Sequence, residues 1–516
     1  MSAKTIGFIL GAAAFLVVIL LPTPSTFHVA AGQYLAGGPN SITPGELAYS
    51  MKVVLALLLL MIIWWITEAI PLPATALLPP VLLPWFHLSG IQGTEVYDLN
   101  LKTLLANYAN PVIYLFLGGF LIAGAMQKWR LDRRFTLWLL TRGTLANDSR
   151  SILLSLMAVT ALLSMWISNT ATAAMMLPLG VGILSLMGSS PGSSRYGTAV
   201  MLGIAWAASI GGVGTIIGTP PNGIGLGILN TVFAHDPSYH RITFIEWMVF
   251  GIPYVVLFVP LVWFILLRFF PPESLTVPGG KERLLSERAG LGSITTPERR
   301  TIGAFLLAVV LWVSNPFWPQ LLPASLAAQL GWIDEYTIGL VVGTLLFVVP
   351  VNIRSASFLL NWQDIRYVDW GTLLLFGGGI ALSDAMFKVG LASWLATAFV
   401  ELFGSPSSLV LLFLIILFVD FLTEVSSNTA VTSMSVPIII SIGQRLGHDP
   451  VLLALGATVA ASMAFMLPVA TPPNALVYGT GHVKIRDMVR VGLVLDLIGA
   501  ILTTLIISLL ASLVLH

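Results

Sequence analysis

Two short polar motifs interrupt apolar stretches of this chain and could bind ions. They are Ser168–Asn169–Thr170 and Ser427–Asn428–Thr429. Where a helix breaks at small polar residues, backbone carbonyl and N–H groups lose their intrahelical partners. Carbonyl, hydroxyl and amide oxygens suit a hard cation such as Na⁺, while the N–H groups of the next helix start attract a carboxylate. The Asn amide can face both ions, because its oxygen accepts and its nitrogen donates.

A second pair of motifs supplies another kind of helix break. Thr219–Pro220–Pro221–Asn222 and Thr471–Pro472–Pro473–Asn474 each contain two consecutive prolines, which remove two backbone donors and break a helix. Carbonyls released before the breaks, near Gly218 and Ala470, can complete a cation cage. We therefore expect each half of the chain to supply one polar hairpin tip and one broken helix, facing one another across a bound anion.

The composition indicates which elements position these motifs. The 516 residues are 57% hydrophobic and 9% charged, with a mean hydropathy of +0.92, whereas soluble domains carry about 25% charged residues. Apolar runs of about 20 residues predict an all-α polytopic membrane protein. The chain has no Cys, and its seven His show no paired ligand spacing, which argues against a metal enzyme. The net charge of +1 gives no attraction for a nucleic-acid partner.

Apolar length and helix breakers together predict about 11 transmembrane helices and two re-entrant hairpins. The expected crossings lie near 5–22, 50–69, 72–87, 111–128, 198–235, 244–270, 299–319, 333–351, 371–389, 450–478 and 490–514. Those at 198–235 and 450–478 are expected to be broken helices. The interrupted stretches 150–187 and 407–446 are interpreted as hairpins that enter the membrane and turn back, although each could also be a pair of helices.

Basic residues set the expected orientation, with the N-terminus cytoplasmic and the C-terminus outside. All but five of the 24 Lys and Arg fall on the predicted cytoplasmic side, as the positive-inside rule requires. The five exceptions are Lys52, Lys102, Arg241, Lys388 and Arg445. The polar segment 271–298 is predicted to be a solvated cytoplasmic linker, and the first apolar segment a retained helix rather than a signal peptide.

The motifs belong to an internal duplication. Phe116–Leu117–Gly118–Gly119 recurs as Leu375–Phe376–Gly377–Gly378, and the Ser-Asn-Thr motif recurs at the same offset of 259 residues. The Thr-Pro-Pro-Asn motif recurs at an offset of 252. The two Gly-Gly helices lie five predicted crossings apart, and this odd number makes the repeats point in opposite directions. Inverted repeats are usual in secondary transporters, with the binding site between them. We expect scaffold helices over 1–110, a first repeat over 111–270 and a second half over 299–516.

The two Ser-Asn-Thr tips, the two Thr-Pro-Pro-Asn breaks and the segment Trp64-Trp-Ile-Thr-Glu-Ala-Ile-Pro resemble the divalent anion:sodium symporter family. That family includes bacterial dicarboxylate transporters and animal di- and tricarboxylate carriers. The resemblance covers nearly the whole chain from about residue 50. It implies a homodimer whose scaffold domains hold the interface while transport domains, here about 134–235 and 391–478, move as elevators.

The resemblance also implies which residues form the sites. For a first sodium ion they are Ser164, Ser168, Asn169 and Gly218, and for a second they are Thr423, Ser427, Asn428 and Ala470. For the substrate they are Asn169, Thr170, Thr219, Pro220, Ser427, Asn428, Thr429, Thr471 and Pro472. Neither tip contains Lys or Arg, so bound Na⁺ and helix N-termini would supply the positive charge. Each ligand would then raise the affinity for the other.

These observations predict a secondary active transporter, not an enzyme, that moves a small dicarboxylate such as succinate or malate with Na⁺ across the plasma membrane, in contact with its lipids. An exchanger of the same fold is the alternative, and sulfate or citrate are alternative substrates. An intramembrane enzyme would need a nucleophile–base pair or a carboxylate dyad, and no His accompanies either tip. A channel is disfavoured because hairpin tips that meet would close a pore.

Five acidic residues lie within or beside apolar runs, where ionisable groups are candidates for function. Glu68, Asp384 and Asp496 are expected to cap helices or to pair at interfaces. A direct role in proton coupling stays open for Asp420 and Glu424, since Glu424 lies three residues before Ser427.

Overall fold

The computed structural model describes residues 2–36, 41–141, 148–192, 194–276 and 280–515. Among them are eight helices long and apolar enough to cross a membrane, or nine if one bent helix pair is a single span. The chain divides into two compact units, and each combines segments from both halves of the sequence. The first unit comprises Met1–Ile113, Gly223–Arg241 and Trp370–Ala461, and the second comprises Tyr114–Asn222, Ile242–Asp369 and Ser462–His516.

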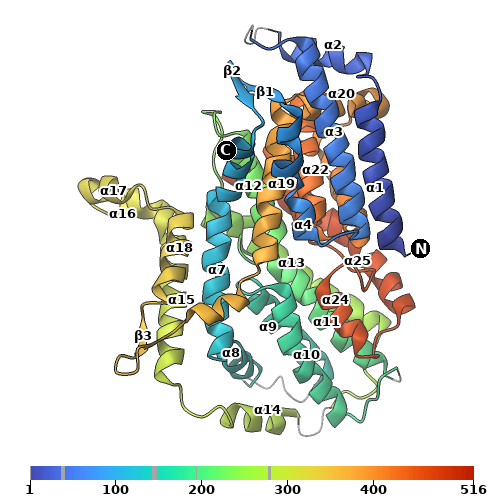
Figure 1. The fold of residues 1–516 in the computed structure, drawn as a ribbon. Helices are drawn as coiled ribbons and strands as arrows, with labels where there is room; N and C mark the ends of the chain where they lie inside the picture. Colours follow the sequence, from blue (N-terminus) through green and yellow to red (C-terminus); the bar gives the residue numbers. More distant parts are fainter. Residues whose placement is uncertain (1, 37–40, 142–147, 193, 277–279, 516) are drawn as a thin grey trace. The chain divides into compact units, whose positions relative to one another are not determined.

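The N-terminal helices of the first unit pack through small residues. Helix α1 (Ala3–Leu20) lies along α3 (Pro44–Thr67) (Figure 1). Gly11 permits this approach, because a Cβ at that position would lie 2.5 Å from the Trp64 ring. The 18 residues of α1 extend about 27 Å, close to the thickness of the hydrocarbon core of a bilayer. Helix α1 therefore matches the crossing predicted at 5–22.

The stretch 72–87 is not the single crossing that its apolar length predicts. It forms the short helices α4 (Leu72–Ala76), α5 (Leu78–Leu82) and the 3₁₀ helix η1 (Leu83–Phe86). Pro79, Pro80 and Pro84 lack the N–H groups that a continuous helix needs, so the chain turns repeatedly. The other elements of this region are α2 (Ser25–Tyr34), the antiparallel strands β1 (Ser89–Gln92) and β2 (Glu95–Asp98), α6 (Leu101–Ala106) and the 3₁₀ helix η2 (Asn107–Ala109).

The remainder of the first unit comes from the second half of the chain. Its helices are α19 (Trp370–Lys388), α20 (Leu391–Phe403), α21 (Ser408–Glu424), α22 (Asn428–Leu446) and α23 (Pro450–Ala460). The interrupted stretch predicted at 407–446 corresponds to α21 and α22. Helices α20 and α21 are bent by 107° relative to each other. Helix α19 approaches α22 closely, since a Cβ at Gly379 would lie 2.4 Å from the Ser433 Oγ.

The second unit contains the motif-bearing helices of the first half. They are α8 (Leu131–Leu140), α9 (Ser149–Ser164), α10 (Asn169–Leu186), α11 (Arg195–Gly212) and α13 (Phe244–Phe269). Helices α9 and α10 form the interrupted stretch predicted at 150–187 and lie side by side (Figure 1). Helices α7 (Pro111–Lys128) and α12 (Pro220–Val232) each contribute residues to both units.

The predicted solvated linker at 271–298 is more structured than a loop. It contains the helix α14 (Gly280–Ala289) and the first turn of α15 (Thr296–Ser314), while its residues 277–279 lie outside the described part of the chain. Glu298 anchors this region, because its side chain accepts a 2.8 Å hydrogen bond from the Arg134 guanidinium. Most of its described residues are exposed, so the segment is solvated, but Gly280–Ala289 forms a helix in place of a loop.

The second unit is completed by several shorter elements. They are the 3₁₀ helix η4 (Asn315–Phe317), α16 (Trp318–Leu321), α17 (Ala324–Leu330), α18 (Glu335–Leu345), the antiparallel strands β3 (Pro350–Asn352) and β4 (Ser357–Phe358), the 3₁₀ helix η5 (Trp362–Tyr367), α24 (Pro472–Gly479), α25 (Ile485–Ile506), the π-helical turn η6 (Ile507–Ala511) and α26 (Ser512–Leu515). The crossing predicted at 333–351 is thus a helix of 11 residues followed by a strand.

Candidate functional site

The first Ser-Asn-Thr motif forms the tip of the α9–α10 hairpin in the second unit. Helix α9 ends at Ser164, and α10 begins at Asn169. The Ser164 hydroxyl donates a 2.7 Å hydrogen bond to Asn169 Oδ1, which orients the amide. Ser168 is the N-cap of α10, and its Oγ accepts a 3.3 Å hydrogen bond from the Ala171 N–H. The tip therefore concentrates hydroxyl and amide oxygens at the positive end of a helix.

The first Thr-Pro-Pro-Asn motif closes a helix break next to this tip. Helix α11 ends at Gly212, and the following helix α12 begins at Pro220. Asn222 bridges the break, because its Nδ2 donates to the carbonyl oxygens of Gly212 at 2.9 Å and Thr215 at 2.8 Å. Asn222 therefore replaces hydrogen-bond donors that an intact helix would have provided to these carbonyls.

Two glycines bring the break against the tip. A Cβ at Gly212 would lie 2.5 Å from Asn169 Oδ1, and a Cβ at Gly218 would lie 2.4 Å from the Gly212 carbonyl oxygen. Thr215 also contacts the tip, because its hydroxyl donates to the Met165 carbonyl oxygen. The second unit thus brings together Ser164, Asn169 and the backbone leading to Gly218, and the cation site at these residues stays a prediction.

The second Ser-Asn-Thr motif, in the first unit, repeats the hydrogen bond between hydroxyl and amide but not the side-chain cap, because Ser427 makes no cap hydrogen bond. Helix α21 ends at Glu424, and α22 begins at Asn428. The Thr423 hydroxyl donates to Asn428 Oδ1 at 2.7 Å and lies 3.0 Å from the Ala461 carbonyl oxygen. Thr423 lies 259 residues after Ser164, the offset found for the two motifs. The hydroxyl–amide hydrogen bond is therefore a repeated feature of both tips.

The second break, in the second unit, repeats the Asn bridge. Asn474 Nδ2 donates to the carbonyl oxygens of Ala464 at 2.9 Å and Leu467 at 3.0 Å. Its two acceptors lie ten and seven residues before it, as the two acceptors of Asn222 do. The Thr471 hydroxyl caps the start of α24 by accepting from the Asn474 N–H at 3.3 Å. In both broken helices, one Asn side chain thus bridges the break by donating hydrogen bonds to two backbone carbonyls.

Two of the predicted substrate residues line one cavity. A hollow of about 560 Å³ in the second unit is bordered by Thr170, at the first tip, and by Pro472, at the second break. Helices α10 and α24 pack against each other in this unit. The predicted residues Thr219, Pro220, Ala470 and Thr471 also belong to the second unit, and Thr423, Ser427, Asn428 and Thr429 belong to the first. That the residues of the first unit and those of the second unit form one binding site stays a prediction.

Two of the acidic residues in apolar regions, Asp384 and Glu68, are paired with lysines. Asp384 accepts hydrogen bonds from the Lys388 ammonium at 2.8 Å and from the Asn107 amide at 3.2 Å. Glu68 lies 3.4 Å from the Lys4 ammonium. The pairing predicted for these two carboxylates is therefore present, and the structure also places Asp496 in a buried position.

Asp420 and Glu424 lie one helical turn apart on α21 and are 0% and 1% exposed. Neither Asp420 carboxylate oxygen has a hydrogen-bond partner among the described residues. The described residues contain no group of three or more His, Cys, Asp or Glu side chains that could hold a metal ion. Any cation at the tips would therefore be held mainly by neutral oxygens.

The sequence interpretation did not give site roles to Asn222, Asn474, Gly212 or Thr215. The two Asn residues were visible as the last letters of the repeated Thr-Pro-Pro-Asn motif, so duplication was the signal that could have identified them. Gly212 and Thr215 carry no comparable signal, because their importance depends on contacts with a tip more than 40 residues earlier.

The helical fold, its apolar spans and the repeated polar tips define the class of protein: the chain is a multi-pass membrane transporter. Residues 43–515 match the family described as the sodium:sulfate symporter transmembrane region. The chain belongs to this family.

Relatives in sequence include sodium-dependent dicarboxylate transporters named SdcS from two staphylococci. The protein from Staphylococcus saprophyticus is 37% identical over 474 residues, covering 90% of this chain and 87% of the relative. The protein from Staphylococcus aureus is 35% identical over 516 residues, covering 98% and 91%.

Solved structures of two bacterial transporters have a similar fold. The Alcanivorax borkumensis YdaH transporter has a TM-score of 0.54 and 15% identity, covering 89% of this chain and 98% of its own. Neisseria gonorrhoeae MtrF has a TM-score of 0.55 and 14% identity, covering 92% and 96%. At these identities the similarity concerns the fold alone.

Proposed function

We propose that this protein is a secondary active transporter that couples Na⁺ to the movement of a small dicarboxylate, such as succinate or malate, across the plasma membrane. The observation that carries the proposal is the repeated tip geometry, in which a hydroxyl donates 2.7 Å to an Asn amide at Ser164–Asn169 and again at Thr423–Asn428. The names of the staphylococcal relatives support the same substrate class and the same coupling ion.

The first sodium ion would be held by Ser164, Ser168, Asn169 and Gly218. Support comes from the contact between Asn169 and the α11–α12 break, where carbonyl oxygens are turned away from regular helix geometry. Discontinuous helices supply such carbonyls to Na⁺ in other transporters. The second ion would be held by Thr423, Ser427, Asn428 and Ala470, through the same set of neutral oxygens.

The dicarboxylate would bind between the two tips. We assign one carboxylate to Asn169 and Thr170 and the other to Asn428 and Thr429, with Ser427 and the residues after each break completing the pocket. Thr170 and Pro472 already share a cavity within the second unit. Since the tips contain no Lys or Arg, the substrate's negative charge would be balanced by the two cations and by helix N-termini. Substrate and sodium affinities would therefore rise together.

The transport cycle would follow from an inverted repeat. We propose that 111–270 and 299–516 are related by inversion, with 1–110 serving mainly as scaffold. Regions near 134–235 and 391–478 would move as a rigid elevator within a homodimer. The matching order of elements supports the repeat. In the first half, helix α7 is followed by the hairpin arms α9 and α10 and by the broken helix α11–α12. In the second half, helix α19 is followed by the hairpin arms α21 and α22 and by the broken helix α23–α24. The N-terminus would be cytoplasmic and the C-terminus outside.

Uptake of radiolabelled succinate into substrate-free proteoliposomes tests the proposal. Uptake should require an inward Na⁺ gradient, and it should disappear when the gradient is replaced by K⁺ or by equal Na⁺ on both sides. If uptake ignored Na⁺ but needed dicarboxylate inside the vesicles, the protein would be an exchanger, and the coupling proposed here would be wrong. Sulfate and citrate as competitors would define the substrate class.

A further inference from the structure

The second unit contains another cavity, which the proposed transport site does not use. Its volume is about 570 Å³, within the range of pockets that bind small organic molecules. It is bounded by α8, by the end of α9 and the following tip, and by α15 with the loop that precedes it. Because the protein spans a membrane, lipid molecules surround it and can reach such a cavity.

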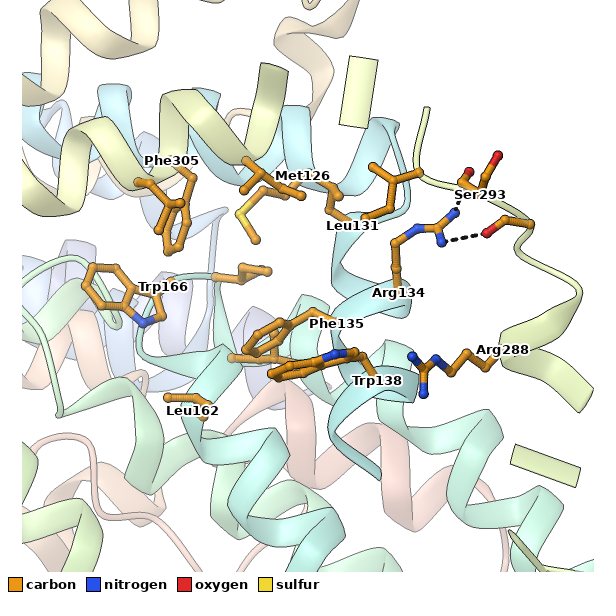
Figure 2. A pocket seen from close by; sticks show the side chains of 16 residues that line it. Met126, Leu131, Arg134, Phe135, Trp138, Leu162, Trp166, Arg288, Ser293 and Phe305 are labelled. Carbon is orange, nitrogen blue, oxygen red and sulfur yellow. Dashed lines mark hydrogen bonds between the residues drawn. The ribbon is translucent and has the colours of Figure 1, made fainter. Parts of the chain in front are cut away.

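The two ends of this cavity differ in chemistry. Figure 2 shows Trp166, Phe305 and Leu162 at one end, and Arg134, Arg288 and Ser293 at the other. Trp166 and Phe305 contact edge to face, with ring centroids 5.3 Å apart. Most of the lining between the ends is apolar. A ligand that fits both ends must therefore carry a hydrophobic chain and an anionic head.

The two arginines differ in how many of their N–H donors the protein itself uses. The Arg134 guanidinium donates to Glu298 at 2.8 Å and to the carbonyl oxygens of Gly292 and Leu291, both at 2.9 Å. Arg288 is exposed and makes one hydrogen bond, of 2.9 Å, to the Thr141 hydroxyl. Among the described residues no carboxylate lies within 4.0 Å of Arg288. Arg288 thus retains donors for an anionic group at the mouth of the cavity.

The depth of the cavity fits one leaflet of a bilayer. Helix α15 begins at Thr296, near the polar end, and reaches the apolar end at Phe305 and Leu306. Ten residues of helix extend about 15 Å, which is about half of a hydrocarbon core roughly 30 Å thick. The lining residues Phe135, Leu162 and Leu306 are 38%, 39% and 52% exposed, so acyl chains can reach the cavity from the bilayer.

We propose that this cavity binds an anionic phospholipid, with an acyl chain against Trp166 and Phe305 and the phosphate on Arg288. Basic pockets at the cytoplasmic ends of membrane helices bind such headgroups, and the mouth lies in the region predicted to be cytoplasmic. The chain would contact Leu163 and Ile167, which directly neighbour Ser164 and Ser168. Resting on the proposed function, we further infer that this lipid stabilises the first tip and raises sodium affinity.

Lipid binding can be measured without transport. The protein is reconstituted in phosphatidylcholine vesicles, and phosphatidylglycerol with brominated acyl chains is titrated in. The Trp166 signal is isolated as the difference from a Trp166→Phe variant. We expect strong quenching by brominated phosphatidylglycerol and weaker quenching by brominated phosphatidylcholine. Equal quenching by both lipids would overturn the anionic preference, and quenching by neither would overturn the site itself.

Two variants assign the binding to the cavity. Arg288→Gln should weaken phosphatidylglycerol binding about fivefold, the factor that corresponds to about 1 kcal/mol for one arginine near an anionic surface. Arg299→Gln removes a neighbouring charge that does not line the cavity, and it should leave binding unchanged. Leu306→Phe should fill the apolar end without adding a tryptophan, and it should reduce quenching of Trp166. If Arg288→Gln and Arg299→Gln behaved alike, the headgroup assignment would be wrong.

The effect of the lipid on sodium affinity is measured in the same vesicles. The quantity measured is the sodium concentration that half-saturates succinate uptake. Phosphatidylglycerol should lower that concentration for the wild-type chain but not for Arg288→Gln. Lipid binding without any change in sodium dependence would overturn the coupling to the tip and leave the site standing. Absence of uptake with intact lipid binding would contradict the proposed function and not the lipid site.

Discussion

The two hairpin tips share one hydrogen bond and differ in others, because Ser168 caps its helix with its side chain and Ser427 does not. Both tips hold the Asn amide by a 2.7 Å hydrogen bond from a hydroxyl, Ser164 in the first and Thr423 in the second. The breaks differ as well, because Gly212 and Gly218 of the first repeat correspond to Ala464 and Ala470 at the offset of 252. The duplication has therefore kept the hydrogen bond between hydroxyl and amide and has changed the residues at the breaks.

Charge is the second difference. At the offset of 259, Asp420 and Glu424 of the second hairpin correspond to Ala161 and Met165 of the first. Ala161 occupies a tight helix contact, because a Cβ at Gly211 would lie 2.3 Å from its carbonyl oxygen. The first hairpin thus has Ala and Met at the positions where the second buries two acids. We infer that close packing distinguishes the first tip, and a pair of buried acids distinguishes the second.

The largest effects should come from the feature that both tips share. Asn169→Ala or Asn428→Ala removes the amide that would face cation and substrate together, so uptake of labelled succinate should be abolished while membrane insertion and folding stay intact. Asn352→Ala changes an exposed Asn in β3 and serves as the control. Full uptake by both tip variants would refute the assignment of the tips as the binding site.

The Asn bridges should be equivalent between the repeats. Asn222→Leu and Asn474→Leu each remove two hydrogen bonds to buried carbonyls, and unpaired buried groups cost about 1–3 kcal/mol each. Both variants should lower the free energy of unfolding by similar amounts and lower the thermal midpoint of the purified protein. A large decrease in the free energy of unfolding for one variant, with no decrease for the other, would show that only one break depends on its Asn.

Gly212→Ala should affect the first tip specifically. The added Cβ would lie 2.5 Å from Asn169 Oδ1, and overpacking of this kind costs about 1–3 kcal/mol. The half-saturating sodium concentration for uptake should therefore rise about tenfold, the factor that 1.4 kcal/mol gives. Gly303→Ala is the control, since nothing lies within 4 Å of a Cβ there. Unchanged sodium dependence would separate Gly212 from the cation site.

Much of this architecture was predictable because membrane helices follow from apolar length. Helix α7 has the bounds expected, and both hairpins and both broken helices were visible as polar motifs inside apolar runs. The stretch 72–87 is long and apolar enough to predict a crossing, but its four prolines break it into short helices, so that prediction was wrong. The bridges of Asn222 and Asn474 could not be derived from sequence, since the acceptors are backbone carbonyls in a break whose path depends on tertiary packing.

The smallest effect should come from the charge that distinguishes the second tip. Asp420→Asn keeps the shape of the side chain and removes a buried carboxyl group one turn before Thr423. Sodium attraction at the second site should weaken, and the half-saturating concentration should rise about threefold, equivalent to about 0.6 kcal/mol at an intermediate dielectric constant. Glu401→Gln, at an exposed position on α20, should leave it unchanged. Normal sodium dependence with loss of accompanying proton movement would instead make Asp420 the proton carrier, and the two tips would then differ in the ion they handle.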